Sequence, residues 1–179
     1  MATDLSLEPR GARELFVVRA RGRLFAVFAE EVEATAEGLA PAPLPGAPPA
    51  VVGVVSLRGR IRTALDPAQL LPDDQPTQTR ATPPADQPNA RDSSGTRDAD
   101  ARTAPRLFVA LRGDEQLALA CDSADGRIEI APAEIVPPTD AHTPSRGTVE
   151  RGGSRVTVLD TALLFDAATR GTERRRKRS

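Results

Sequence analysis

One stretch of nineteen residues occurs twice in this chain, and the repeat limits the folds that the chain can adopt. Residues 53–71 (GVVSLRGRIRTALDPAQLL) match residues 147–165 (GTVERGGSRVTVLDTALLF) at a constant offset of 94 positions, without a gap. Upstream, residues 15–17 and 107–109 both read LFV, at an offset of 92. The identical pairs in the longer match are Gly53/Gly147, Val55/Val149, Gly59/Gly153, Thr63/Thr157, Leu65/Leu159, Asp66/Asp160, Ala68/Ala162 and Leu70/Leu164. Such a repeat predicts one supersecondary unit used twice, in stacked or paired modules.

The local patterns of both copies are those of β-strands. Ile61, Thr63 and Leu65 alternate with Arg60 and Arg62, so we expect the first three side chains on the buried face of a strand. Similar alternation is found at 107–111, 117–121 and 155–158. Glycines that permit positive φ mark hairpin turns at 21–23, 58–60, 112–114 and 152–154. Short strands with closely spaced turns predict an all-β fold of small barrels or sandwiches.

Each copy ends in a predicted short helical turn. Asp66 precedes Pro67, which is the pattern of an N-cap followed by the first helical residue, and Asp160 repeats it before Thr161. Paired carboxylates also serve acid–base catalysis, but capping explains both positions without any chemistry. Residues 29–37 (AEEVEATAE) fit either a helix or a strand around Val32.

The segment between the copies has the composition of a disordered insertion. Residues 72–105 contain no Val, Ile, Leu or Phe, so they bury too little apolar surface to offset the entropy of ordering them. A lone copy of about 60 residues would be marginally stable, so we expect the copies to bury a face against each other. The predicted parts are a flexible N-terminus (1–12), a first barrel (13–72), a disordered insertion (73–105), a second barrel (106–167) and a basic flexible tail (168–179).

Residues that carry most enzyme chemistry are scarce. The chain has one Cys and one His, whereas a Cys/His zinc site needs about four such ligands. We expect Cys121 in a barrel core, with a reactive thiol as the alternative, and His142 in a solvated loop. No nucleophile elbow of a hydrolase and no phosphate-binding glycine motif is present. The sequence therefore predicts a non-enzymatic protein with no catalytic, cofactor-binding or metal site and no small-molecule substrate.

The overall charge argues against a dedicated nucleic-acid binder. Lys and Arg number 24 against 25 Asp and Glu, and the chain has no Trp or Tyr on which bases would stack. The exception is the basic tail at 170–179, which is either a solvated end or a contact for anionic lipid or nucleic acid. A small-barrel protein that binds nucleic acid or membranes through this tail is the alternative function. Because we find no signal peptide and no apolar run long enough to cross a membrane, we expect a cytoplasmic protein.

Several motifs together resemble the CheW-like domain family. Residues 53–59 (GVVSLRG), a following hairpin strand and then Leu65-Asp66 are similar to its G-V-x-N-L-R-G…D-L signature. The approach at 44–49 (LPGAPP), the opening at 15–33 (LFVVRARGRLFAVFAEEVE) and the segment 106–130 (RLFVALRGDEQLALACDSADGRIEI) are also similar to that family. The resemblance covers about residues 14–71 and 106–165.

This resemblance implies two small five-stranded SH3-like barrels packed side by side, with short helical turns. It also implies a non-enzymatic adaptor of chemotaxis-type signalling. Members of the family join the tips of methyl-accepting chemoreceptors to the regulatory domain of the CheA histidine kinase, so contact with a membrane would be only indirect, through receptors. A fragment or paralogue of such a kinase domain is a further interpretation, although no phosphate-cradling or receiver sequence accompanies the repeat.

The family motif also implies positions that contact a partner. They are Arg58, Gly53 and Gly59, together with Val51, Val52 and Val54, which line a groove between the barrels or belong to the core. Arg58 is expected at a hairpin tip, where it either contacts a partner or pairs with an internal carboxylate.

Three departures from the family pattern predict a divergent member. Ser56 stands where the family has Asn, Arg62-Thr63 replaces an apolar-Pro pair, and the 73–105 insertion replaces a short link.

Overall fold

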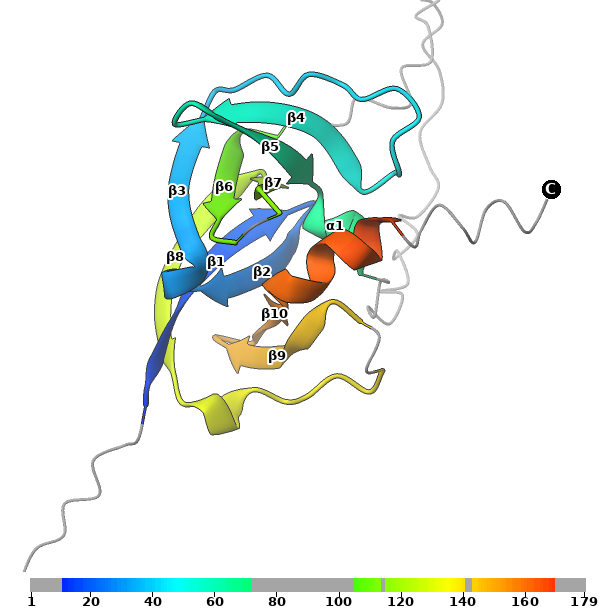
Figure 1. The fold of residues 1–179 in the computed structure, drawn as a ribbon. Helices are drawn as coiled ribbons and strands as arrows, with labels where there is room; N and C mark the ends of the chain where they lie inside the picture. The colour runs from blue at the N-terminus through cyan, green and yellow to red at the C-terminus, as the bar shows by residue number, and fades with distance from the viewer. Residues whose placement is uncertain (1–10, 72–104, 114, 141–142, 170–179) are drawn as a thin grey trace, which may run out of the picture.

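Ten strands in the described part of the chain form two five-stranded sheets (Figure 1). The computed structural model describes residues 11–71, 105–113, 115–140 and 143–169, so the predictions for 1–10, 73–104 and 170–179 lie outside it. The strands are β1 (Arg13–Ala20), β2 (Arg23–Phe28), β3 (Val32–Glu37), β4 (Val51–Leu57), β5 (Arg60–Leu65), β6 (Leu107–Leu111), β7 (Leu117–Cys121), β8 (Ser123–Ile130), β9 (Ser145–Arg151) and β10 (Ser154–Leu159). Sheet A has the order β8-β1-β2-β10-β9, and sheet B has the order β3-β6-β7-β5-β4. The predicted all-β fold with two five-stranded units is confirmed.

Each sheet combines a hairpin from one copy of the repeat with three strands from the other. β1 and β2 lie in sheet A beside β8, β9 and β10, whereas β6 and β7 lie in sheet B beside β3, β4 and β5. The two orders are equivalent, and each contains one parallel pair, β2–β10 or β5–β7. The prediction of one barrel from residues 13–72 and another from 106–167 is therefore wrong. A repeat shows which segments share a local structure, but a strand can pair with its own copy or with the equivalent strand of the other copy.

The chain passes from sheet A to sheet B through the 3₁₀ turn η1 (Ala29–Glu31), and Glu31 holds this crossing. Its carboxylate accepts hydrogen bonds from the backbone N–H of Phe28 (3.2 Å), from Arg146 Nη2 (2.9 Å) and from Thr161 Oγ1 (3.0 Å). Arg146 and Thr161 belong to the second copy, so these bonds tie the two copies together at the point where the chain first crosses from one sheet to the other. Residues 29–37 thus form a single turn followed by a strand, which decides between the two predicted alternatives.

The repeat extends to individual backbone bridges beside the edge strands. Ala42 pairs with Val54 through two hydrogen bonds of 2.8 Å, and the positions 94 residues later, Val136 and Thr148, pair through two of 2.9 Å. In each copy, therefore, the segment before the edge strand β4 or β9 turns back and covers part of that strand's free edge.

Gly53 and Gly147 permit these bridges. A Cβ at Gly53 (φ +152°) would clash with the carbonyl group of Ala42, and a Cβ at Gly147 (φ +141°) would clash with that of Val136. The glycine is therefore identical in both copies because two backbones approach too closely for any side chain.

Three apolar clusters hold the sheets together. One contains only residues of sheet A (Leu15, Val17, Ala26, Phe28, Ile130, Val149, Val156 and Val158). Another contains only residues of sheet B (Ala34, Val55, Leu57, Ala64, Phe108, Ala110, Ala118 and Ala120). The third joins the two sheets, with Phe25, Val27 and Leu159 from sheet A and Leu65, Val109 and Leu119 from sheet B among its members. The side chain of Cys121 is buried in this shared cluster and not in either of the clusters that belong to a single sheet.

Short helical turns close both copies, as predicted. α1 (Pro67–Leu70) begins after Asp66, whose Oδ1 accepts from the backbone N–H of Ala68 at 3.0 Å. η3 (Thr161–Leu163) begins after Asp160, whose Oδ1 accepts from that of Ala162 at 3.2 Å. The predicted capping is confirmed.

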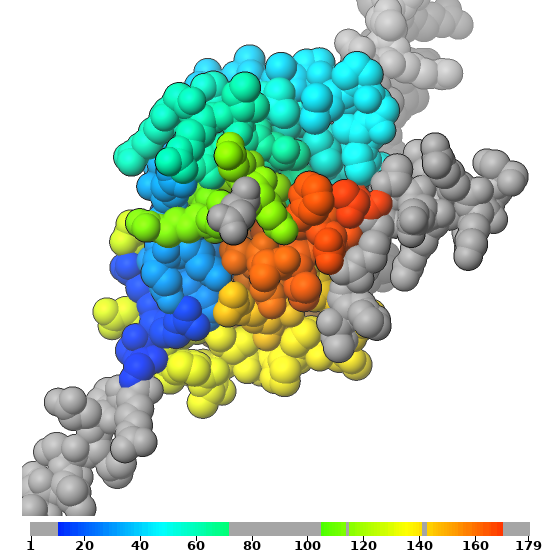
Figure 2. Space-filling view, in the orientation of Figure 1, coloured from blue at the N-terminus to red at the C-terminus, as the bar shows by residue number. Residues whose placement is uncertain are grey.

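A helical segment at 164–169 continues from η3 and lies between the two layers of the molecule (Figure 2, orange to red). Ala168 is buried in the shared cluster, so the prediction that the flexible tail begins at residue 168 is wrong. The remaining 3₁₀ turn, η2 (Pro132–Glu134), follows β8.

We expect Gly147→Ala to destabilise the protein more than Gly113→Ala, although the two glycines have nearly the same φ (+141° and +142°). No atom lies within 4 Å of a Cβ at Gly113, so that variant loses only about 1–3 kcal/mol to backbone strain. At Gly147 the Cβ also displaces the Val136 bridge, which adds about 1–3 kcal/mol. Urea unfolding of both variants measures the difference, and equal losses would contradict the close approach.

Candidate protein-interaction surface

The β4–β5 hairpin turns through two residues with positive φ. Arg58 has φ +50° and Gly59 has φ +76°. The β1–β2 turn repeats this geometry with Arg21 and Gly22, and the β9–β10 turn repeats it with two glycines. Turns of this kind favour Gly, Asn or Asp, because a side chain with a Cβ is strained at positive φ. Arginine is therefore an unfavourable residue at positions 21 and 58.

The two strained arginines differ in what their side chains contact. Arg21 Nε donates to Asp66 Oδ2 at 2.7 Å, so its strained position is compensated by an ion pair that secures α1. Arg58 is exposed, and its side chain makes no hydrogen bond or ion pair with the residues that the structure describes. Arg58 was expected either to contact a partner or to pair with an internal carboxylate, and it pairs with no carboxylate among the described residues.

The outer face of the same hairpin carries an exposed apolar side chain. Ile61 is 68% exposed, and it lies opposite Ser56 on β4, next to the Val54–Thr63 pair. We call Val54, Arg58, Arg60 and Ile61 the hairpin surface. The predicted alternation along β5 is wrong, because Ile61 points outward and Arg62 is buried.

A partner distant in sequence explains why Arg62 faces inward. Its Nη1 donates to the Leu111 carbonyl oxygen at 2.8 Å, and its Nη2 forms an ion pair with Glu33 on β3. The hydrogen bond from Arg62 holds the pKa of Glu33 below its usual range, so this carboxylate is charged at neutral pH. Alternation within one strand cannot reveal a carboxylate supplied by another.

The other predicted contact residues occupy different environments. Val51 packs against the shared cluster and Val52 against the cluster of sheet B, whereas Val54 is half-buried on the outer face. Gly53 is buried beneath the Ala42 bridge, and Gly59 is exposed in the turn. All six residues thus lie on the β4–β5 hairpin, but only Val54, Arg58 and Gly59 are on its outer face or tip, while the other three lie beside or within the packed interior. Ile61 is the surface residue that the sequence pattern concealed.

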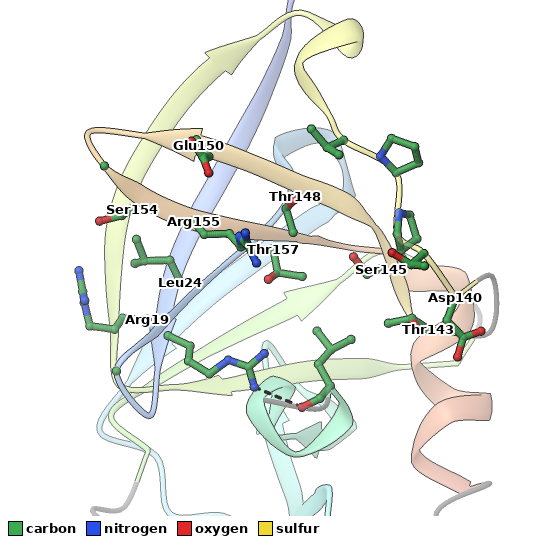
Figure 3. A pocket seen from close by; sticks show the side chains of 18 residues that line it. Arg19, Leu24, Asp140, Thr143, Ser145, Thr148, Glu150, Ser154, Arg155 and Thr157 are labelled. Carbon is green, nitrogen blue, oxygen red and sulfur yellow. Dashed lines mark hydrogen bonds between the residues drawn. The ribbon is translucent and has the colours of Figure 1, made fainter. Parts of the chain in front are cut away.

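The equivalent region of the second copy is a polar cleft of about 760 Å³ (Figure 3). Thr148, Glu150, Arg155 and Thr157, on β9 and β10, occupy the positions of Val54, Ser56, Ile61 and Thr63. The dashed line in Figure 3 marks the hydrogen bond from Arg23 Nη1 to the Leu71 carbonyl oxygen, 3.2 Å long, at the boundary of this cleft. None of the predicted contact residues lines it. The exposed apolar side chain on the hairpin itself is therefore a feature of the first copy, whereas the exposed apolar side chain at the cleft of the second copy is Val136, on the segment that is bridged to β9.

The described residues offer little reactive chemistry. Burial raises the pKa of the Cys121 thiol, which disfavours the reactive thiolate. The described ranges contain no group of three or more His, Cys, Asp or Glu side chains arranged to hold a metal ion, and His142 lies outside them. No helix in the described ranges is both long and apolar enough to cross a membrane.

We expect Arg58→Asn to raise the free energy of unfolding by about 0.5–1 kcal/mol, because Asn tolerates the positive φ of the turn. Arg21→Asn is the matched control. It relaxes the same backbone strain but loses the ion pair with Asp66, worth about 0.5–1 kcal/mol, so we expect no net gain. Thermal or urea unfolding measures both. A loss of stability in Arg58→Asn would show that this arginine supports the fold.

Comparison with known proteins identifies the fold. A structure of the scaffolding protein TtCheW from Thermoanaerobacter tengcongensis superposes with a TM-score of 0.57 at 14% sequence identity, covering 83% of this chain and 89% of that one. No curated protein sequence matches the chain. The sequence model of the CheW-like domain matches residues 14–169. The chain belongs to the CheW-like domain family.

Proposed function

We propose that this protein is a non-enzymatic, cytoplasmic adaptor that couples chemoreceptors to a CheA-type histidine kinase. Given that the chain belongs to the CheW-like family, one observation supports the proposal most directly. Arg58 occupies a strained position at a hairpin tip, is exposed, and has no side-chain partner among the described residues. Residues that the surrounding structure holds in strained conformations concentrate at functional sites, so a strained and exposed arginine supports a binding role.

The chemistry of the hairpin surface supports a protein partner. Arg58 and Arg60 are exposed guanidinium groups at the end of the hairpin, and Ile61 is an exposed apolar side chain on the face of β5 opposite to Arg60. Arginine is enriched among the residues that dominate binding energy, and a buried apolar anchor surrounded by polar groups is the usual anatomy of an interface. The proposed partners are the tips of methyl-accepting chemoreceptors and the regulatory domain of the kinase. Contact with the membrane would then be indirect, through the receptors.

We expect Arg58→Glu to weaken co-sedimentation with receptor-containing membranes and kinase by about 2 kcal/mol, which is about thirtyfold in affinity. The reason is that the charge at the centre of the hairpin surface is reversed. Arg106→Glu is the matched control, because Arg106 is exposed next to the end of β6 that lies away from the hairpin tip.

The two variants separate the possible outcomes. Equal retention of Arg58→Glu and Arg106→Glu would remove Arg58 from the contact surface. If the unaltered protein does not sediment with any receptor and kinase pair tested, the adaptor function fails for those partners. Equal loss in both variants would indicate an effect of overall charge and would also contradict a specific site.

A further inference from the structure

Sheet B contains an arginine at a position where sheet A has an ordinary core residue. Arg62 and Val156 are equivalent in the repeat, and both side chains are only 2% exposed. The cluster around Arg62 is rich in alanine, with Ala34, Ala64, Ala110, Ala118 and Ala120 among its members. These small side chains leave room for the long stem of Arg62, which takes the place of the aliphatic residue found in the other sheet.

The contacts of Arg62 join three strands. From β5 its guanidinium reaches the Leu111 carbonyl oxygen on β6 and the Glu33 carboxylate on β3, while Nε is buried without a hydrogen-bond partner. Burying an ion pair is often no more stabilising than well-packed apolar side chains of similar size. Because Val156 fills the equivalent position without any ion pair, folding alone gives no reason for an arginine here.

Glu33 is the group that Arg62 controls. Its side chain is 29% exposed, so other side chains can reach it. Arg60 and Arg112 are also close enough to favour its charged form. Arg112 donates from Nε to the Val32 carbonyl oxygen at 3.3 Å, whereas Arg60 makes no side-chain hydrogen bond or ion pair with the described residues. If Arg62 released Glu33, Arg60 would be an available partner, because Arg60 lies on the same face of β5 as Arg62.

We propose that Arg62 is a positioning residue of the hairpin surface: by engaging Glu33 inside sheet B, it leaves Arg60 available for a partner with exposed carboxylates. The inference rests on the proposed function only for the identity of that partner. Arg62 acts through Arg60, because its own side chain is buried. An acidic surface on the partner is the chemistry that an exposed guanidinium group at the start of β5 would select.

A measurement without any partner tests the positioning role. The full chain is treated with an arginine-specific dicarbonyl reagent, and mass spectrometry follows the modification of Arg60, with Arg58 and Arg106 as internal references. We expect Arg62→Met to slow the modification of Arg60 about threefold, as an exposed ion pair with the released Glu33 would. Arg62→Met combined with Glu33→Gln should restore the rate, because Glu33 no longer carries a carboxylate that can pair with Arg60.

Two further arms keep this test decisive. The double variant has no unpaired buried charge and is expected to fold, and Arg62→Lys keeps a positive charge near Glu33 and should retain the original modification rate. If Arg60 reacts equally fast in Arg62→Met and in the unaltered protein, or remains slow in the double variant, the positioning role is wrong.

Binding of the same variants then identifies the partner. Sedimentation with receptor membranes and kinase should weaken in Arg62→Met and recover in the double variant, whereas loss of packing alone would leave the double variant impaired. If the unaltered protein binds neither partner, the proposed function fails while the modification result still decides the role of Arg62.

Discussion

The exchange of hairpins between the two copies is the constraint on which the rest of the structure depends. Because β1 and β2 pair with strands of the second copy, and β6 and β7 with strands of the first, neither sheet forms from one copy alone. The shared apolar cluster and the bonds to Glu31 then fix the two sheets against each other. The exchange makes the sheets one folding unit, since losing either copy removes strands from both. The insertion connects α1, which follows strand β5 of sheet B, to β6, which is itself a strand of sheet B. Its length therefore leaves the strand pairing of both sheets intact.

The repeat separates residues that serve folding from residues that do not. Gly53 and Gly147 are identical because both lie beneath a backbone bridge, and Asp66 and Asp160 are identical because both cap a helical turn. The copies diverge at the β4–β5 hairpin and its equivalent β9–β10. There, Arg58, Ile61 and Arg62 correspond to Gly152, Arg155 and Val156. Because the second copy folds with other residues at these positions, the fold does not require Arg58, Ile61 or Arg62 there.

The sequence predicted those features that depend on neighbours along the chain. The capping of Asp66, the glycine turns and the short β-strands follow from short-range patterns, and all are found, whereas the number of strands in each unit came from the resemblance to the family. The exchange of hairpins was not predictable, because equivalent strands carry the same pattern whichever copy they join. The prediction that Ile61 points inward and Arg62 outward was wrong, because it too depends on residues that are distant in sequence. Hydrophobicity along β5 favours Ile61 inside, but Glu33 and the Leu111 carbonyl, supplied by other strands, satisfy a buried guanidinium.

A comparison of Arg21 with Arg58 gives the hairpin surface its physical meaning. Both residues have φ +50° in turns of the same geometry, so both carry the same backbone strain. At Arg21 the ion pair with Asp66 offsets that strain within the chain. At Arg58 no described residue does so. The turn is held there by the pairing of β4 with β5, and the guanidinium group of Arg58 stays exposed. On the proposed function, contact with a partner would offset the strain that the chain leaves uncompensated at this tip.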